Sequence, residues 1–257
     1  MGLILFIPAV AQSSDECLGW FKKTGINPKD SGCEVDCAAV ETDMATFMCT
    51  NRCDEFCRPA PKCKHDPFWM QKIKDGRAVG WPVPLEKSVA WSKDEREALL
   101  TVLDQLPDDL KVKGLRGIYR LQKSVDIINP GSQNEGAISL YDRAFGGPFS
   151  LGRVIAHELA HQWYAEAPKA IRQGYESELG WRLSSKGNES PKHIPDRKFV
   201  SPDADDSPQE DFAHNVDTYL FQPDKLRSIS PKAFDWIRKH FSKEFKLREG
   251  CKDAARK

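Results

Sequence analysis

The sequence predicts an α+β fold, in which a small mixed sheet is followed by a largely helical C-terminal half. Apolar residues recur at helical spacing over about 93–106, 150–164 and 231–245, whereas large residues alternate as in a strand over 136–142. Seven of the eight cysteines lie between residues 17 and 63, which sets an N-terminal segment apart from this fold. A chain of 257 residues can bury a substantial core in one or two domains.

The charge balance does not point to a polyanionic partner. Lysine plus arginine equals aspartate plus glutamate, at 38 each, so the formal net charge is zero. Nucleic acids and anionic membrane surfaces both attract proteins through an excess of positive charge. The composition therefore gives no reason to expect a nucleic acid or a membrane surface as partner.

Residues 1–11 have features of a signal peptide. The apolar run over 3–11 is too short to span a bilayer as a helix, and its final Ala-Val-Ala is typical of a signal-peptidase site. The positive charge that usually precedes such a run is missing, so a buried first strand is the alternative. We expect export to a secreted or periplasmic location, without a membrane-spanning segment.

Residues 12–64 are cysteine-rich, and we expect a disulfide-linked helical hairpin there. Cys33 and Cys37, like Cys49 and Cys53, are four residues apart and therefore lie on one face of a helix. Two antiparallel helices of this kind predict the disulfides Cys33–Cys53 and Cys37–Cys49, an arrangement similar to the twin CxxxC hairpins of small intermembrane-space chaperones. A structural zinc site is the alternative, although such sites usually have closer spacings. Three pairings are open to the other cysteines, which are Cys17, Cys57, Cys63 and Cys251.

Residues 65–91 contain prolines, glycines and tryptophans without a steady period. This composition predicts an ordered, extended connection to a domain over 92–257. The domain opens with a capping-box sequence at 92–95, and leucines at helical spacing follow it up to Pro107. We therefore expect a helix over about 93–106.

The rest of the domain alternates between predicted strands, a loop and helices. The sheet is predicted from apolar or alternating stretches over 115–121, 125–128 and 136–142. Residues 183–206 are rich in Ser, Pro, Asp and Lys, which predicts a long surface loop that could rim a cleft. Ser-Pro pairs then open two further helices, over about 208–220 and 231–245.

The helix predicted over 150–164 carries a motif with metal-binding chemistry. Its apolar stripe includes Ile155 and Leu159, and His157 and His161 lie roughly opposite. Because residues four apart are neighbours on a helix, both imidazoles can bind one Zn²⁺ ion, at about 2.0–2.1 Å.

Glu158 follows the first histidine of the motif and is turned about 100° from it, toward an open coordination position. There it can act as general base on a water that zinc has acidified. The pattern is specific, because two of only six histidines have this spacing, with a glutamate in the required position. The alternative is a helix whose histidines face solvent or hydrogen-bond in the core.

The His157–His161 motif resembles that of the zincin metallopeptidases. Metzincins continue with a glycine and a third histidine, which the following residues do not provide. The chain instead resembles the gluzincins, whose third zinc ligand is a glutamate in an E-x-x-A context on a later helix. Residues 210–213 match that context, so the resemblance implies a zincin-like domain with Glu210 as third ligand. It covers about 75 residues and rests on two short motifs.

Glu210 has a second interpretation. In the sequence Ser-Pro-Gln-Glu it stands where a capping-box glutamate would bond back to Ser207 at the start of its own helix. We favour the ligand role, because zinc without a third protein ligand would be held weakly. The fallback ligands are Glu166, Glu176, Glu178 and Glu189.

Two polar residues follow Glu210 on the same helix face. Thermolysin-like gluzincins support a zinc histidine with an aspartate four residues after the glutamate, whereas this chain has His214 there. Asp217 is a candidate for that orienting role, and His214 for a hydrogen bond to the substrate oxyanion. An ordinary polar helix face is the alternative for both. Other candidate oxyanion donors are Tyr141, Tyr175 and Tyr219.

The strand over 136–142 precedes the metal helix, where gluzincin-like peptidases commonly pair a sheet edge with an extended substrate. The resemblance therefore implies a polypeptide substrate, with an interior strand as the alternative. Two further interpretations are a zinc amidase acting on cell-wall peptides and a secreted binding module with a vestigial zinc site. Similar cores occur in exported bacterial toxins and secretion-system effectors, which makes a secretion-system or host partner conceivable by association.

Overall fold

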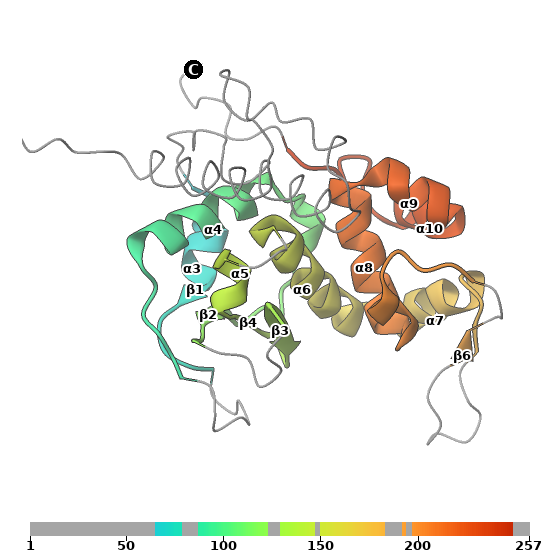
Figure 1. Ribbon diagram of the computed structural model, residues 1–257. Helices are drawn as coiled ribbons and strands as arrows, with labels where there is room; N and C mark the ends of the chain where they lie inside the picture. Colours follow the sequence, from blue (N-terminus) through green and yellow to red (C-terminus); the bar gives the residue numbers. More distant parts are fainter. Residues whose placement is uncertain are drawn as a thin grey trace, which may run out of the picture.

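The computed structural model describes residues 65–78, 87–122, 129–146, 150–182, 192–193 and 197–248, and Figure 1 shows their arrangement. Several expectations lie outside the described residues. They are the signal peptide over 1–11, the segment over 12–64, the strand over 125–128, every cysteine and Glu189. Within the described part, helices and a small mixed sheet make up the fold, which confirms the α+β class.

The sheet has four strands, in the order β1-β2-β4-β3. β1 (Ile73–Lys74), β2 (Gly117–Arg120) and β4 (Ala137–Leu140) run parallel, and β3 (Gly131–Asn134) pairs with β4 in the antiparallel direction. A two-residue turn joins β3 to β4, and both of its residues, Glu135 and Gly136, have positive φ angles. This is the backbone that a tight hairpin with the native strand twist requires.

The strand expected over 136–142 is β4, and it lies inside the sheet. The hairpin places β3 on the outer side of β4, so β3 is an edge strand. The interpretation of the strand over 136–142 as an edge is wrong, and the alternative, an interior strand, is confirmed. Strand pairing of β3 is invisible in the sequence because Gly-Ser-Gln-Asn contains no apolar or β-branched residue.

The expected extended connection over 65–91 contains regular structure at its start. Asp66 caps α3 (Pro67–Lys72) by accepting a hydrogen bond from the Phe68 amide, and proline occupies the first helical position. Trp69 of this helix is fully buried in the core, and β1 follows directly. The domain therefore uses residues well before residue 92 for its sheet and core.

The helix expected over 93–106 is α4 (Lys93–Gln105). Its capping box is present, because the Glu95 amide donates to Ser92 Oγ and the Ser92 amide donates to Glu95 Oε2, both at 3.1 Å. Leu99 and Leu103 of α4 are fully buried. The sequence therefore located this helix to within one residue.

The C-terminal half is helical, as predicted, but contains more helices than the sequence indicated. Two that were not predicted are α7 (Lys169–Glu178) and α9 (Pro223–Ile229). α10 ends at His240 rather than near 245, because Phe241 is extended and Ser242 donates to the Asp109 carboxylate. The other helices are α5 (Asp142–Gly146), α6 (Leu151–Glu166) and α8 (Pro208–Phe221), with short 3₁₀ turns η2 (Asp108–Leu110) and η3 (Pro202–Asp205).

α6 lies at the centre of the molecule, with the sheet on one side and α8 on the other (Figure 1). Ile155 and Leu159 on its apolar face are fully buried in one continuous core. Part of the expected loop over 183–206 is regular, since β5 (Trp181–Arg182) pairs with β6 (Lys192–His193) and η3 packs on α8. Within the described residues, no helix combines the length and apolarity needed to cross a bilayer.

Candidate metal centre

Two histidines on adjacent turns of α6 begin the site. Ser150 caps the helix by accepting a hydrogen bond of 3.2 Å from the Arg153 amide, and the chain then stays helical for sixteen residues. The four-residue spacing places His157 Nε2 and His161 Nε2 only 2.9 Å apart. Both side chains are largely buried against α8.

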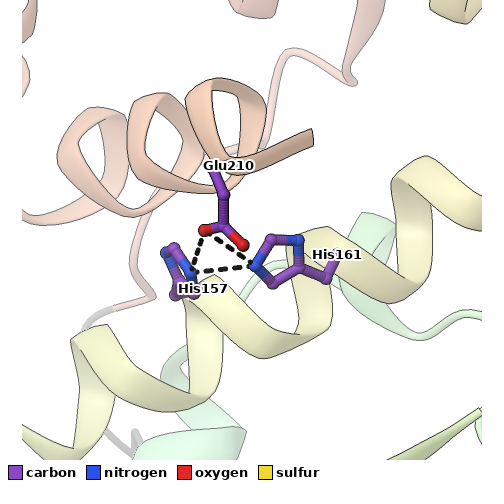
Figure 2. A group of neighbouring side chains, drawn as sticks. All are labelled: His157, His161 and Glu210. Carbon is purple, nitrogen blue, oxygen red and sulfur yellow. Dashed lines mark hydrogen bonds and ion pairs between the residues drawn. The ribbon is translucent and has the colours of Figure 1, made fainter. Parts of the chain in front are cut away.

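Glu210, in the first turn of α8, is the third member. Its Oε2 atom lies 3.4 Å from His157 Nε2 and 3.3 Å from His161 Nε2, so the three side chains point at one another (Figure 2). Ser207 Oγ caps α8 by accepting a hydrogen bond from the Glu210 amide. The backbone of Glu210 thus serves the cap, while its carboxylate faces the histidines.

The spacing of the three ligand atoms fits one zinc ion. Tetrahedral ligands about 2.0–2.1 Å from a metal lie about 3.3 Å from each other. The separations here are 2.9, 3.3 and 3.4 Å. Two imidazoles and one carboxylate are a donor set of catalytic zinc sites, in which the fourth position stays open. His157, His161 and Glu210 could therefore hold a metal ion.

The carboxylates of Glu210 and Asp217 place negative charge beside the position where a cation would bind. Burial opposes a charged His157, but its ion pairs with Asp217 and Glu210 outweigh burial and raise its pKa to about 10. Burial alone would raise the pKa of Glu210, yet the two histidines hold it far below its usual range. Burial lowers the pKa of His161. Before a metal binds, the proton on His157 supplies part of the positive charge that the metal would bring.

Glu158 lies beside this group, on the same helix. Its side chain is almost fully buried, and burial raises its pKa to about 7, with His157 opposing and Glu210 adding to the shift. A general base is most effective when its pKa is near the operating pH. The environment of Glu158 therefore suits proton transfer at neutral pH.

Asp217 lies behind His157 and is almost fully buried. Its Oδ2 atom is 3.5 Å from His157 Nδ1, on the side of the ring away from Glu210, and its Oδ1 atom accepts a bond of 2.9 Å from Arg153 Nε. Burial would raise the pKa of Asp217, but Arg153 and the histidines hold it well below its usual range. A charged carboxylate in this place fixes the tautomer and orientation of His157.

His214, the candidate oxyanion donor, lies between two carboxylates. Its Nδ1 atom lies 3.5 Å from Asp217 Oδ2, and its Nε2 atom lies 3.3 Å from Asp203 Oδ2, so both ring nitrogens face carboxylates. Burial opposes its protonation, but the two aspartates raise its pKa. The centroids of the His214 and His157 rings lie 4.4 Å apart, so His214 packs against the first candidate ligand.

A second group of possible ligands shares His157, and it consists of His157, His214 and Asp217. A cation there would compete with the Arg153 guanidinium for the charge of Asp217. If both groups held an ion at once, His157 would also have to bind two metal ions, one through each nitrogen. One ion bound by His157, His161 and Glu210 avoids both problems.

The other candidate residues lie elsewhere. Glu166 accepts from the Gly114 amide at 3.1 Å and from the Gln162 side chain, and Tyr164 donates to Glu176. Glu178 is exposed. The three tyrosines are engaged outside the group: Tyr141 OH bonds with Ser132 Oγ, Tyr175 OH donates to Asp211, and Tyr219 packs against Phe234.

Sequence reasoning missed the neighbours that hold the site. Arg153 precedes His157 by one helical turn and pairs with Asp217, and a search for charged residues four before a ligand could have found it. Asp203 comes from the region expected to be a loop, and no pattern marks it. Asp211, next to Glu210, is buried and accepts hydrogen bonds from Tyr175, Trp181, Arg197 and Asn215.

Comparison with known proteins leaves the family open. No protein family, characterised protein or solved structure was found that matches this chain. The resemblance to the gluzincins therefore rests on the two short motifs and on the convergence of His157, His161 and Glu210 in space.

Proposed function

We propose that the protein is a zinc-dependent peptidase, with His157, His161 and Glu210 as zinc ligands. The observation that carries this proposal is the set of separations between their ligand atoms, 2.9, 3.3 and 3.4 Å, drawn from two helices far apart in the sequence. A bound zinc ion would supply a Lewis acid that polarises a carbonyl group and acidifies water. The proposal belongs with a zincin-like fold of the gluzincin type.

Glu158 is the catalytic base in this proposal. It accepts a proton from the attacking water and later delivers that proton to the leaving amine, as one carboxylate can do when its pKa lies near 7. Asp217 and Arg153 keep His157 oriented, so the position of this histidine does not depend on the substrate.

A polypeptide is the substrate class that the sheet favours. β3 is one of the two edge strands of the four-stranded sheet and packs beside α6, which carries Glu158. An edge strand can pair with an extended peptide through backbone hydrogen bonds, whatever the side chains of that peptide. In this proposal, the strand over 131–134 pairs with the substrate, in place of the strand over 136–142.

The proposal is tested with three measurements on the full chain. Zinc content is measured after dialysis, and turnover is measured with casein and, separately, with peptidoglycan. The same assays are run on Glu158→Gln, which keeps the shape of the side chain but cannot accept a proton. The expected result is about one zinc per chain in both proteins, with casein cleaved by the wild type only.

Other outcomes would change the conclusion. Cleavage of peptidoglycan but not casein would favour a cell-wall amidase. Absence of zinc, or no turnover of either substrate, would reject the peptidase and favour a binding module. Turnover that Glu158→Gln leaves unchanged would reject Glu158 as the base. We also propose a secreted or periplasmic setting, which the cysteine-rich segment supports through its composition.

A further inference from the structure

One face of the edge strand β3 is packed against the active-site helix. Gly131 and Gln133 are two residues apart and share a face of the strand. Val154, Glu158 and Gln162 are each four residues apart and share a face of α6. The two faces meet, because Gln133 Nε2 donates a 2.6 Å hydrogen bond to Gln162 Oε1 and because Gly131 adjoins Val154 and Glu158.

Gly131 faces the candidate base directly. A Cβ atom at this position would lie 2.9 Å from Glu158 Oε1 and 3.1 Å from both Glu158 Cγ and Val154 Cγ1. Separations this short require the neighbouring atoms to move. Positive φ angles occur in the described part at Gly76, Glu135, Gly136 and Gly180, so the backbone of Gly131 does not demand glycine. Glycine is required at this position only because a larger side chain would lack space.

The strand cannot easily move away to make that space. Gly131 is paired with Leu140 inside the sheet, and Gln133 is tied to Gln162, whose own amide donates to Glu166. Glu166 in turn accepts a bond from the Gly114 amide. The free end of the Glu158 side chain is the part of this contact that can shift at least cost.

We propose that Gly131 is a positioning residue, which lets the Glu158 carboxylate lie against the edge strand at the distance from the histidines that the reaction needs. This inference rests on the proposed function, because it assigns Glu158 the role of base. A methyl group at position 131 would leave the fold and the three zinc ligands in place but displace the carboxylate by part of an ångström. A misplacement of about 1 Å can lower a rate about 100-fold.

The kinetic test uses Gly131→Ala, with Gly174→Ala as the matched control. Gly174 lies on α7, where an added Cβ would meet no atom within 4 Å. We expect Gly131→Ala to keep its zinc and its KM for a casein-derived peptide, while kcat falls about tenfold. Gly174→Ala should keep wild-type kcat. A role in folding alone would lower the apparent kcat only by reducing the folded, zinc-loaded fraction, so kcat calculated per bound zinc would stay at the wild-type value.

A second test needs no turnover. The melting temperature of the zinc-free protein is measured for the wild type, Gly131→Ala, Glu158→Ala and the double variant. In the background that keeps Glu158, Gly131→Ala should lower the melting temperature by roughly 5 °C. The loss should be less than half as large in the Glu158→Ala background, because the crowded side chain is gone. If Gly131→Ala does not fold, the double variant should restore folding.

The outcomes separate the two proposals. An inactive wild type would overturn both the peptidase and the role of Gly131. An active wild type with an unchanged kcat in Gly131→Ala, or an equal loss of melting temperature in both backgrounds, would overturn the positioning role alone. A double variant that fails to fold when Gly131→Ala also fails would do the same.

Discussion

Glu210→Ala is the most direct perturbation of the candidate metal centre. The substitution removes a carboxylate that lies 3.4 and 3.3 Å from the two histidine Nε2 atoms and leaves two ligands on α6. Four-ligand zinc sites bind with about 10–16 kcal/mol, or about 2.5–4 kcal/mol for each ligand. Since about 1.4 kcal/mol corresponds to tenfold in affinity, zinc should bind roughly 100- to 1000-fold more weakly.

The assay is a competition titration between the protein and a chelator of known zinc affinity. Glu178→Ala is the matched control, because Glu178 is exposed on α7 and should leave the affinity unchanged. Ser207→Ala tests the capping interpretation of the same segment. It should lower stability by about 1 kcal/mol through loss of the hydrogen bond from the Glu210 amide, with little effect on zinc.

Retention of wild-type affinity in Glu210→Ala would refute the assignment. Glu166→Ala would then be the next variant to measure, but its carboxylate is bonded to Gly114 and Gln162. A loss of affinity in Ser207→Ala as large as in Glu210→Ala would show that helix capping, rather than the carboxylate, determines zinc binding.

Three further predictions concern the residues around the ligands. Asp217→Asn should weaken zinc binding about 10- to 100-fold in the same titration, because His157 loses its charged partner, and an unchanged affinity would contradict the orienting role. Zinc affinity should rise at least tenfold per pH unit between about pH 7.5 and 8.5. The reason is that the raised pKa of His157, about 10, keeps that side chain protonated until zinc displaces the proton. An affinity independent of pH would mean that His157 is already neutral. Asp211→Asn should lower the melting temperature by roughly 10 °C, since removing one partner of the buried ion pair with Arg197 costs about 3–5 kcal/mol. The control Asp206→Asn, at an exposed position, should leave the melting temperature unchanged. Equal melting temperatures for the two variants would contradict a stabilising role of Asp211.

The parts of the fold that sequence reasoning located are those that local interactions determine. The capping box of Ser92 and Glu95 marks the start of α4, and Pro107 lies just beyond its end. The four-residue spacing of His157 and His161 is a property of one helix, so their approach to 2.9 Å follows from the sequence once that helix is recognised.

The parts that it missed depend on contacts between distant segments. β3 is a strand because β4 folds back on it through a turn with two positive φ angles, and its own polar residues carry no strand pattern. The pairing of Arg153 with Asp217 joins residues 64 apart, and neither residue type indicates its partner. Asp66 and Pro67 do form a helix-start signal for α3, which the absence of a longer apolar period concealed.

The first turn of α8 shows how one segment satisfies three requirements that compete in the sequence. The Glu210 amide donates to Ser207 Oγ, which caps the helix, while the Glu210 carboxylate faces the histidines. Asp211 is turned about 100° farther round the helix and accepts bonds from Tyr175, Trp181 and Arg197 in the core. Because that network holds the turn from behind, the position of the Glu210 carboxylate is set by the fold before any metal binds. Capping and metal binding are therefore compatible at Glu210, since they use different atoms of the same residue.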